Sequence, residues 1–374
     1  MLLSGHHVLT SAGWKKDMTV CIENGRIISV YPGLTDTPYE YLTSGLIDMH
    51  VHGGQGYNTE TEDMEGLKRF LLWEAQNGVT DVLLTVSTAS LKIYRECIPF
   101  IRKAIAMQKE GKLPGAVIQG IHLEGPFLSS NRLGAMVPDA IMRASVDNLL
   151  AITGGALDDI RLVSIAPEIE GAEEVIRYLA EHGVCVQAGH TDASFEEAKQ
   201  GFAWGIDSLC HTFNACHPIH HRDPGVVTAA LTDPDVYCET ICDMNHLHPG
   251  TIAMIQRCKG REKMCIISDT IWTTCLPDGV YHTELGKDII VKNGIMRISN
   301  GSLDGGVCTI GQSMSRLIEK GFEAEDVLYS ASVSPSNRLR LSNMGTLDAG
   351  RVAHVSAWNE KLEIQQTRIG DTRY

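Results

Sequence analysis

Several side chains that could bind a metal ion or transfer a proton stand at the ends of apolar, β-rich segments of this sequence. They are His50 and His52, Glu124, His190, His211, His246 and Asp269. Imidazole nitrogens and carboxylate oxygens suit a borderline divalent metal such as zinc. If the segments are parallel strands of one barrel, their carboxyl ends meet at one rim, and residues far apart in the sequence converge there. The pattern therefore predicts a divalent metal site, with zinc as the expected ion.

The candidate ligands differ in how specific their local sequence is. In His50-Val51-His52 the period of two turns both imidazoles to the same strand face, where they could share one cation. An isolated pair of this kind is more often just a polar strand end, but further candidate ligands downstream favour metal binding. His190 and His211 follow two successive apolar segments, which favours ligands over two unrelated core or surface histidines.

Two carboxylates complete the set. Glu124 is followed by Gly125 and Pro126, which break a strand and let the backbone turn across the barrel mouth; the alternative is an ordinary loop carboxylate. Asp269 ends the last apolar segment and could merely cap a helix. Beside a metal it is better suited to act as a general base that accepts a proton from water and later returns it.

Residues 216–225 hold the densest group of potential cations in an otherwise acidic chain. The planar guanidinium of Arg222 suits a phosphate group, and the alternative is a solvated arginine paired with Asp223. The formal net charge of −14 opposes nonspecific attraction to nucleic acid, so a nucleic-acid partner is not expected. An anionic small molecule would have to be bound by a few focused cations or backbone donors.

Eight apolar segments alternate with helical patterns and predict an α/β fold, a TIM-like (β/α)8 barrel, over residues 45–339. The expected strands are 46–51, 79–86, 116–123, 160–165, 184–188, 206–209, 237–242 and 264–268. The expected helices include 64–76, 93–108, 172–181, 194–201 and 249–257, with Gly78 and Gly183 as helix stops. Short β-like patterns at both ends predict that residues 1–44 and 340–374 form one small β-sandwich domain.

The composition places the chain among globular proteins, with 43% hydrophobic residues. The 11 cysteines lack paired CxxC spacing, and several, such as Cys185, Cys210 and Cys265, lie in apolar segments, so we expect reduced thiols in a core. The sequence has no apolar stretch near the roughly 20 residues needed to span a bilayer, and its start does not read as a secretion signal. A cytoplasmic protein without a membrane partner is expected.

Taken together, five motifs resemble those of the N-acetylglucosamine-6-phosphate deacetylases of the amidohydrolase superfamily. They are Gly-Leu-Ile-Asp-x-His-x-His, His-Leu-Glu-Gly-Pro-Phe, Ala-Gly-His-Thr-Asp-Ala, His-Thr-Phe-Asn-Ala and His-Arg-Asp-Pro-Gly. The resemblance implies that Glu124, His190 and His211 hold the principal metal ion and that Asp269 is the catalytic acid and base. His50 and His52 would add a second metal site, which some family members lack.

The same resemblance implies a phosphorylated amino sugar as substrate. The positions that match sugar-phosphate contacts are Asn214, Ala215, Arg222, His246 and Leu303. The family counterpart of Arg222 serves the neighbouring subunit's site, which implies a homodimer. The implied reaction is hydrolysis of the acetamide, most simply of N-acetylglucosamine-6-phosphate, to acetate and the amine.

Two departures from the family pattern leave the substrate open. Met136 stands where relatives commonly have a histidine that contacts substrate, and a thioether cannot donate a hydrogen bond. Asp304 adds an acidic group to the later substrate loop. The alternatives are another N-acyl sugar, such as N-acetylgalactosamine-6-phosphate, another amide, or a metal- or sugar-phosphate-binding protein without catalysis. The presence of Asp269 argues against the last, since binding alone needs no base.

Overall fold

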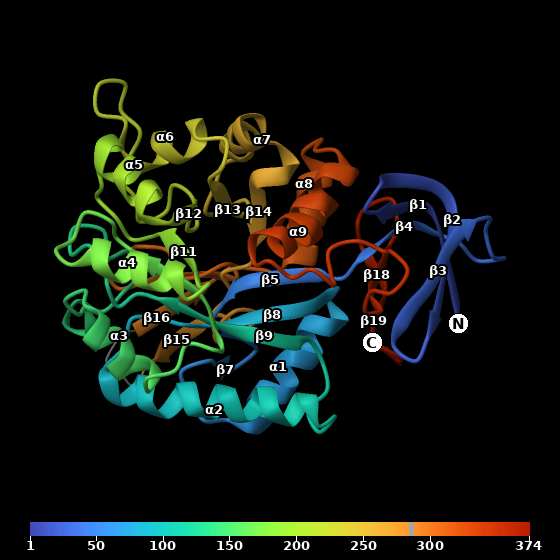
Figure 1. Ribbon diagram of the computed structural model, residues 1–374, viewed down its shortest axis with the longest axis horizontal. Helices are drawn as coiled ribbons and strands as arrows, with labels where there is room; N and C mark the ends of the chain where they lie inside the picture. The colour runs from blue at the N-terminus through green and yellow to red at the C-terminus, as the bar shows by residue number, and fades with distance from the viewer. Residues whose placement is uncertain (284–287) are drawn as a thin grey trace.

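A computed structural model describes residues 1–283 and 288–374, and its centre is an eight-stranded parallel sheet in chain order (Figure 1). The strands are β5 Leu46–Val51, β8 Val79–Val86, β9 Val117–Glu124, β10 Ile160–Ile165, β11 Cys185–Ala188, β12 Ile206–Leu209, β13 Tyr237–Ile241 and β14 Met264–Ile267. Each predicted strand agrees with the observed one to within one residue at either end. The predicted α/β barrel is confirmed.

The first and last strands of the sheet meet at their carboxyl ends. The Asp269 amide donates a hydrogen bond to the His50 carbonyl (3.0 Å), and the His52 amide donates one to the Thr270 carbonyl (2.8 Å). Just before these, the Asp48 carboxylate accepts a hydrogen bond from the Ser268 amide (3.3 Å). These bonds close the barrel and bring Asp269 beside the two histidines of β5.

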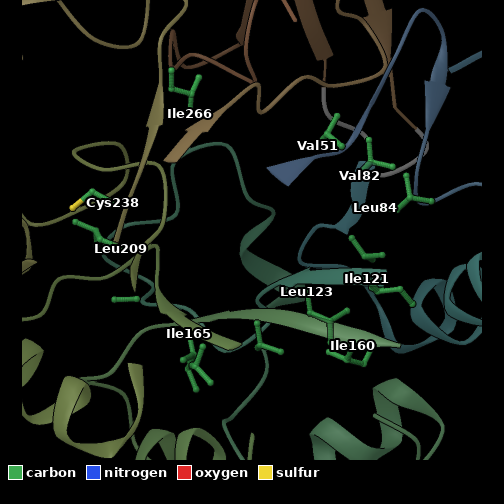
Figure 2. Close-up of a cluster of buried hydrophobic side chains, with 14 of the residues drawn as sticks. Val51, Val82, Leu84, Ile121, Leu123, Ile160, Ile165, Leu209, Cys238 and Ile266 are labelled. Atoms are coloured by element: carbon green, nitrogen blue, oxygen red, sulfur yellow. The ribbon is translucent and has the colours of Figure 1, made fainter. Parts of the chain in front are cut away.

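Helices cover the outer face of the barrel and connect its strands (Figure 1). They are α1 Met64–Gln76, α2 Leu91–Lys109, α3 Val146–Thr153, α4 Ala172–Glu181, α5 Phe195–Trp204, α6 Gly225–Thr232, α7 Pro249–Lys263, α8 Ile310–Glu319 and α9 Ala324–Arg338. Figure 2 shows part of the apolar layer beneath them, with Val51, Leu84, Leu123 and Ile266 among its labelled side chains. Burial of this layer is the main force that holds each helix against the sheet.

The predicted helix stops have a clear backbone cause. Gly78 and Gly183 follow the ends of α1 and α4 with φ of 90° and 75°, and their amides donate to Ala75 and Ala180 carbonyls. A positive φ is easy for glycine and costly for residues with a Cβ, so glycine ends these helices at a defined point.

The two chain ends build a separate seven-stranded sheet beside the barrel, in the order β20-β19-β18-β4-β1-β2-β3 (Figure 1). Its strands are β1 Leu2–Thr10, β2 Gly13–Glu23, β3 Arg26–Pro32, β4 Tyr39–Ser44, β18 His354–Trp358, β19 Ile364–Ile369 and β20 Thr372–Arg373. All neighbouring strands are antiparallel except β1 and β4. It has its own core, in which Val8, Val20, Ile27, Leu42 and Val355 are buried.

A small antiparallel sheet follows β14 that the sequence reading did not anticipate. It consists of β15 Gly279–His282, β16 Asp288–Lys292 and β17 Ile295–Ile298. Ile289, Val291 and Met296 form its buried side, and Ile271 and Trp272 pack against them. The insertion therefore adds a wall to the carboxyl side of the barrel.

Two observations bear on the composition. The cysteines are free thiols, as expected. Within residues 1–283 and 288–374 no helix is both long and apolar enough to cross a lipid bilayer.

A buried ion pair joins the terminal sheet to the barrel, and it gives the fold a predicted pH dependence. His354 Nδ1 lies 2.9 Å from Asp81 Oδ2. Burial lowers the pKa of His354, but Asp81 outweighs this effect and the net shift is upward. The pair's contribution is therefore fully present below the unfolded pKa of about 6.5 and is lost as pH rises through the folded pKa.

We expect His354→Gln to lower the free energy of unfolding by about 1–3 kcal/mol at pH 6, because a buried carboxylate loses its charged partner. The loss should be smaller at pH 9 than at pH 6, because less of the wild-type His354 carries a proton at the higher pH. Urea denaturation at both pH values measures the two differences. Equal destabilisation at pH 6 and pH 9 would contradict the role of the charge.

Candidate active site

Glu124, the last residue of β9, lies at the centre of a buried group of imidazoles. Its Oε1 is 2.9 Å from His211 Nε2 and 3.1 Å from His190 Nε2. The two histidines follow β12 and β11, and their Nε2 atoms are 3.2 Å apart. The three residues that the sequence predicted as principal metal ligands are thus brought together.

The second predicted pair faces the same carboxylate from the other side of the barrel mouth. His52 Nε2 is 3.2 Å from Glu124 Oε2, and His50 Nε2 is 3.4 Å from Glu124 Oε1. Asp269 Oδ1 lies 3.4 Å from the Nε2 atoms of both histidines. The predicted orientation of His50 and His52 to one face is correct, and Asp269 joins them.

The other ring nitrogen of each histidine has a partner of its own. The Nδ1 partners are Arg132 O for His190 (3.0 Å), Asn214 O for His211 (3.1 Å), Ser87 Oγ for His52 (3.1 Å) and Glu239 Oε2 for His50 (3.0 Å). A carbonyl oxygen only accepts, so His190 and His211 carry a proton on Nδ1, and in the neutral form of each ring an Nε2 lone pair would face the centre. Such contacts are typical of histidines that bind metals.

Three groups of these side chains could hold a metal ion. They are Glu124, His190 and His211; His50, His52 and Asp269; and His50, Glu124 and Cys210. His50 Nε2 is buried and has no hydrogen-bond partner among the described residues, although two carboxylate oxygens lie 3.4 Å away. A buried imidazole nitrogen directed at carboxylates without bonding them fits a site that shares a cation.

The charges of the group are strongly coupled. Burial raises the pKa of Glu124, but His50 and hydrogen bonds from His190 and His211 outweigh burial and hold it well below its usual range. Burial lowers the pKa of His52, yet Asp269 and Glu124 raise it to about 9. The carboxylates draw protons onto the imidazoles, and a bound divalent cation would replace those protons.

The backbone is strained at three of these residues. His190, His211 and Asp269 have φ of 47°, 21° and 53°, in the region that favours glycine. Such conformations cost of order 1–3 kcal/mol each and cluster at functional sites. Here they turn the chain directly after β11, β12 and β14, so that each side chain enters the barrel mouth.

A cavity of about 620 Å³ opens above the group. Asn214, Ala215, His246 and Leu303 line it, as the sequence predicted for residues that contact the substrate. Met136 and Asp304 also line it, so both departures from the family pattern fall on the cavity wall. The cavity therefore offers polar contacts and the Met136 thioether to the same ligand.

Arg222 does not lie on this cavity wall. It is exposed on the loop before α6, next to His221. Among the described lining residues there is no lysine or arginine, while Glu60, Glu96 and Asp304 are present. Contact of Arg222 with a neighbouring subunit's site, as the family resemblance implies, stays a prediction.

Two carboxylates of the site were missed by the sequence reading. Asp243 Oδ2 lies 2.9 Å from His246 Nδ1 and orients that ring toward the cavity. Burial raises the pKa of Asp243, but His246 and nearby amides lower it to about 2. The Asp-x-x-His spacing after β13 could have suggested this pair. Glu239, on β13 itself, gave no such signal.

The amidohydrolase family matches residues 41–372. The chain belongs to the amidohydrolase family. The match spans the whole barrel and the later strands β18 and β19, so the resemblance drawn from the motifs is confirmed, and this amidohydrolase is an enzyme.

Two relatives and one solved structure are similar to this chain over nearly its whole length. An N-acetylgalactosamine-6-phosphate deacetylase of Escherichia coli is 31% identical, over 98% of this chain and 97% of its own. An N-acetylglucosamine-6-phosphate deacetylase of Vibrio furnissii is 32% identical, over 97% and 92%. A mutant N-acetyl-D-glucosamine-6-phosphate deacetylase of Mycobacterium smegmatis, solved in complex with N-acetyl-D-glucosamine-6-phosphate, aligns with a TM-score of 0.88 at 26% identity, covering 100% and 98% of the two chains.

Proposed function

We propose that this amidohydrolase removes the acetyl group of an N-acetylated amino-sugar phosphate, with N-acetylglucosamine-6-phosphate as the first candidate. The observation that carries the proposal is the convergence of Glu124, His190 and His211 beside Asp269, at the base of a cavity lined by Asn214 and His246. The products would be acetate and the free amine. The named relatives and the Mycobacterium complex support the substrate class.

Glu124, His190 and His211 would hold the principal divalent ion, for which zinc is the first choice, and His50 and His52 a second ion. When bound, the ion would polarise the acetamide carbonyl and lower the pKa of water from about 15.7 to about 7. Asp269 would accept the proton of the attacking water at a carboxylate oxygen. It would then return that proton to the amine nitrogen as the amide bond breaks.

The remaining residues would position the sugar. His246, oriented by Asp243, would donate to a sugar hydroxyl or to the carbonyl, and Asn214, Ala215 and Leu303 would contact the sugar phosphate. Arg222 would bind the phosphate of the neighbouring subunit's substrate, which makes a homodimer the proposed assembly. Binding energy gained far from the amide would thereby orient the reacting group.

We further propose that residues 45–339 form the catalytic domain and that residues 1–44 and 340–374 form the supporting one. The cavity lining supports this division, since all its described residues fall between His52 and Gly305. We also propose a cytoplasmic location, as the sequence predicted.

N-acetylgalactosamine-6-phosphate is the second candidate substrate, and Met136 is the residue that supports it. A thioether on the cavity wall offers no donor where the family histidine would, so either a neighbouring residue supplies that hydrogen bond or the sugar differs. The relative from Escherichia coli supports this alternative.

Release of acetate from both N-acetylated sugar phosphates and their unphosphorylated forms, with metal content measured on the same sample, tests the proposal. We expect kcat/KM to be at least about a hundredfold higher with the phosphate, since loss of a charged contact of about 3 kcal/mol has that effect. Equal rates without phosphate would reject the substrate class. Ligand binding without acetate release under several metals would instead indicate a binding protein.

A further inference from the structure

Glu239 lies inside the barrel, within β13, and its side chain is fully buried. Its Oε2 is 3.0 Å from His50 Nδ1 and 3.2 Å from the backbone nitrogen of His211. One carboxylate oxygen thus contacts a member of each proposed metal-binding set. We propose that Glu239 is a positioning residue that orients His50 and thereby enables the centre to hold its second ion, an inference that rests on the proposed metal-dependent function.

Glu239 fixes the direction of the His50 ring. An ionised carboxylate only accepts hydrogen bonds, so the proton of a neutral His50 lies on Nδ1, facing Glu239. Nε2 is then left with its lone pair, and it points to Glu124 and Asp269, 3.4 Å away. Without Glu239 the ring could carry its proton on Nε2 instead, and that tautomer cannot bind a metal at the centre.

Glu239 should matter more for one of the two proposed metal sites than for the other. His190 and His211 have backbone carbonyls as Nδ1 partners, at 3.0 and 3.1 Å, and these carbonyls do not depend on Glu239. For His50 Nδ1, the other neighbour among the described residues is the Cys210 thiol, whose sulfur is 3.7 Å away and bonds weakly. Loss of Glu239 should therefore affect the His50 and His52 side more than the principal site.

The buried Glu239 carboxylate lowers the stability of the fold. Its Oε1 is buried and has no hydrogen-bond partner among the described residues. An unsatisfied buried carboxylate oxygen destabilises a fold, and an apolar residue of similar size would pack there at lower cost. A cation bound at the centre would stabilise the Glu239 carboxylate, whose negative charge adds to those of Glu124 and Asp269. A residue costly to the fold yet in contact with metal ligands is expected at a functional position.

The test compares zinc binding by the chelator-stripped full-length chain and by Glu239→Met, using calorimetric titration and metal analysis. We expect two ions per wild-type chain. Glu239→Met should hold the second ion about 10- to 100-fold more weakly, the usual effect of removing an orienting partner of a metal-binding histidine. The first ion should stay near its wild-type affinity.

Two further variants make the result specific. Gln187→Met removes another fully buried polar side chain of the barrel interior, which bonds Ser164 and not a proposed ligand, and it should keep both ions. Glu239→Gln retains an oxygen that could accept from His50, so its loss of affinity should be smaller than that of Glu239→Met. If Glu239→Met does not fold, the second-ion affinity of Glu239→Gln still tests the role of Glu239.

A wild-type chain that takes up one ion only would overturn the inference. So would unchanged second-ion affinity in both Glu239 variants, or an equal loss in Gln187→Met. The titration uses zinc alone and no sugar, so a wild-type chain that binds two ions but releases no acetate would reject the proposed function and leave this inference standing.

Discussion

Replacement of Asp269 by Asn should lower kcat about a thousandfold, within the 10²–10⁴ range for loss of a general acid–base group. Asn has nearly the same shape as Asp but cannot accept the proton of water. In the structure the carboxylate lies 3.4 Å from the Nε2 atoms of His50 and His52 and is buried at the cavity base. Steady-state rates of acetate release measure the effect.

Metal content and substrate binding are the controls for this variant. Glu124, His190 and His211 form their group without Asp269, so the principal ion should remain bound. The dissociation constant for the substrate should change little, because Asp269 acts on the reacting water and not on the sugar. Normal turnover in Asp269→Asn would refute the role, and loss of the principal ion would assign Asp269 to metal binding instead.

The strands and most of the site were predictable because a parallel barrel imposes a strong pattern on its sequence. Strands such as Val79–Val86 are buried at every position, and most of their side chains are therefore apolar, with Thr80, Asp81 and Thr85 as the polar positions of this strand. Glu124 ends β9, and His190 and Asp269 follow the ends of β11 and β14. Convergence at one rim followed from topology alone, without knowledge of any distance.

Other features depend on geometry that a sequence does not specify. Glu239 lies within a strand whose residues are nearly all buried, and its direction depends on how β13 pairs with β12 and β14. The β15–β17 insertion has strands of four or five residues with few buried side chains, so its apolar pattern in the sequence is weak. Arg222 is exposed on its own chain, and its predicted contact requires a second chain.

Replacement of Glu124 by Gln should remove the principal metal ion and, with it, nearly all activity. Glu124 contacts four imidazole Nε2 atoms at 2.9–3.4 Å, so no other residue described has the same central place. An amide offers one neutral oxygen and a donor nitrogen that cannot bind a cation. We expect at least a thousandfold loss of activity, roughly what loss of one electrostatic group in a closed site costs, together with a zinc content near zero.

Glu74→Gln is the matched control for that variant. Glu74, on α1, is also fully buried, and neither of its carboxylate oxygens has a hydrogen-bond partner among the described residues. Burial and the nearby Asp48 raise the pKa of Glu74 well above its usual range, which favours the neutral acid and makes an amide a mild replacement. Metal retained in Glu74→Gln and lost in Glu124→Gln would tie the ion to the central carboxylate and not to buried acidity in general. If the Glu124→Gln chain kept both its zinc and its turnover, Glu124 would not be a metal ligand. The metal would then be bound by other residues, without the carboxylate that the histidines surround.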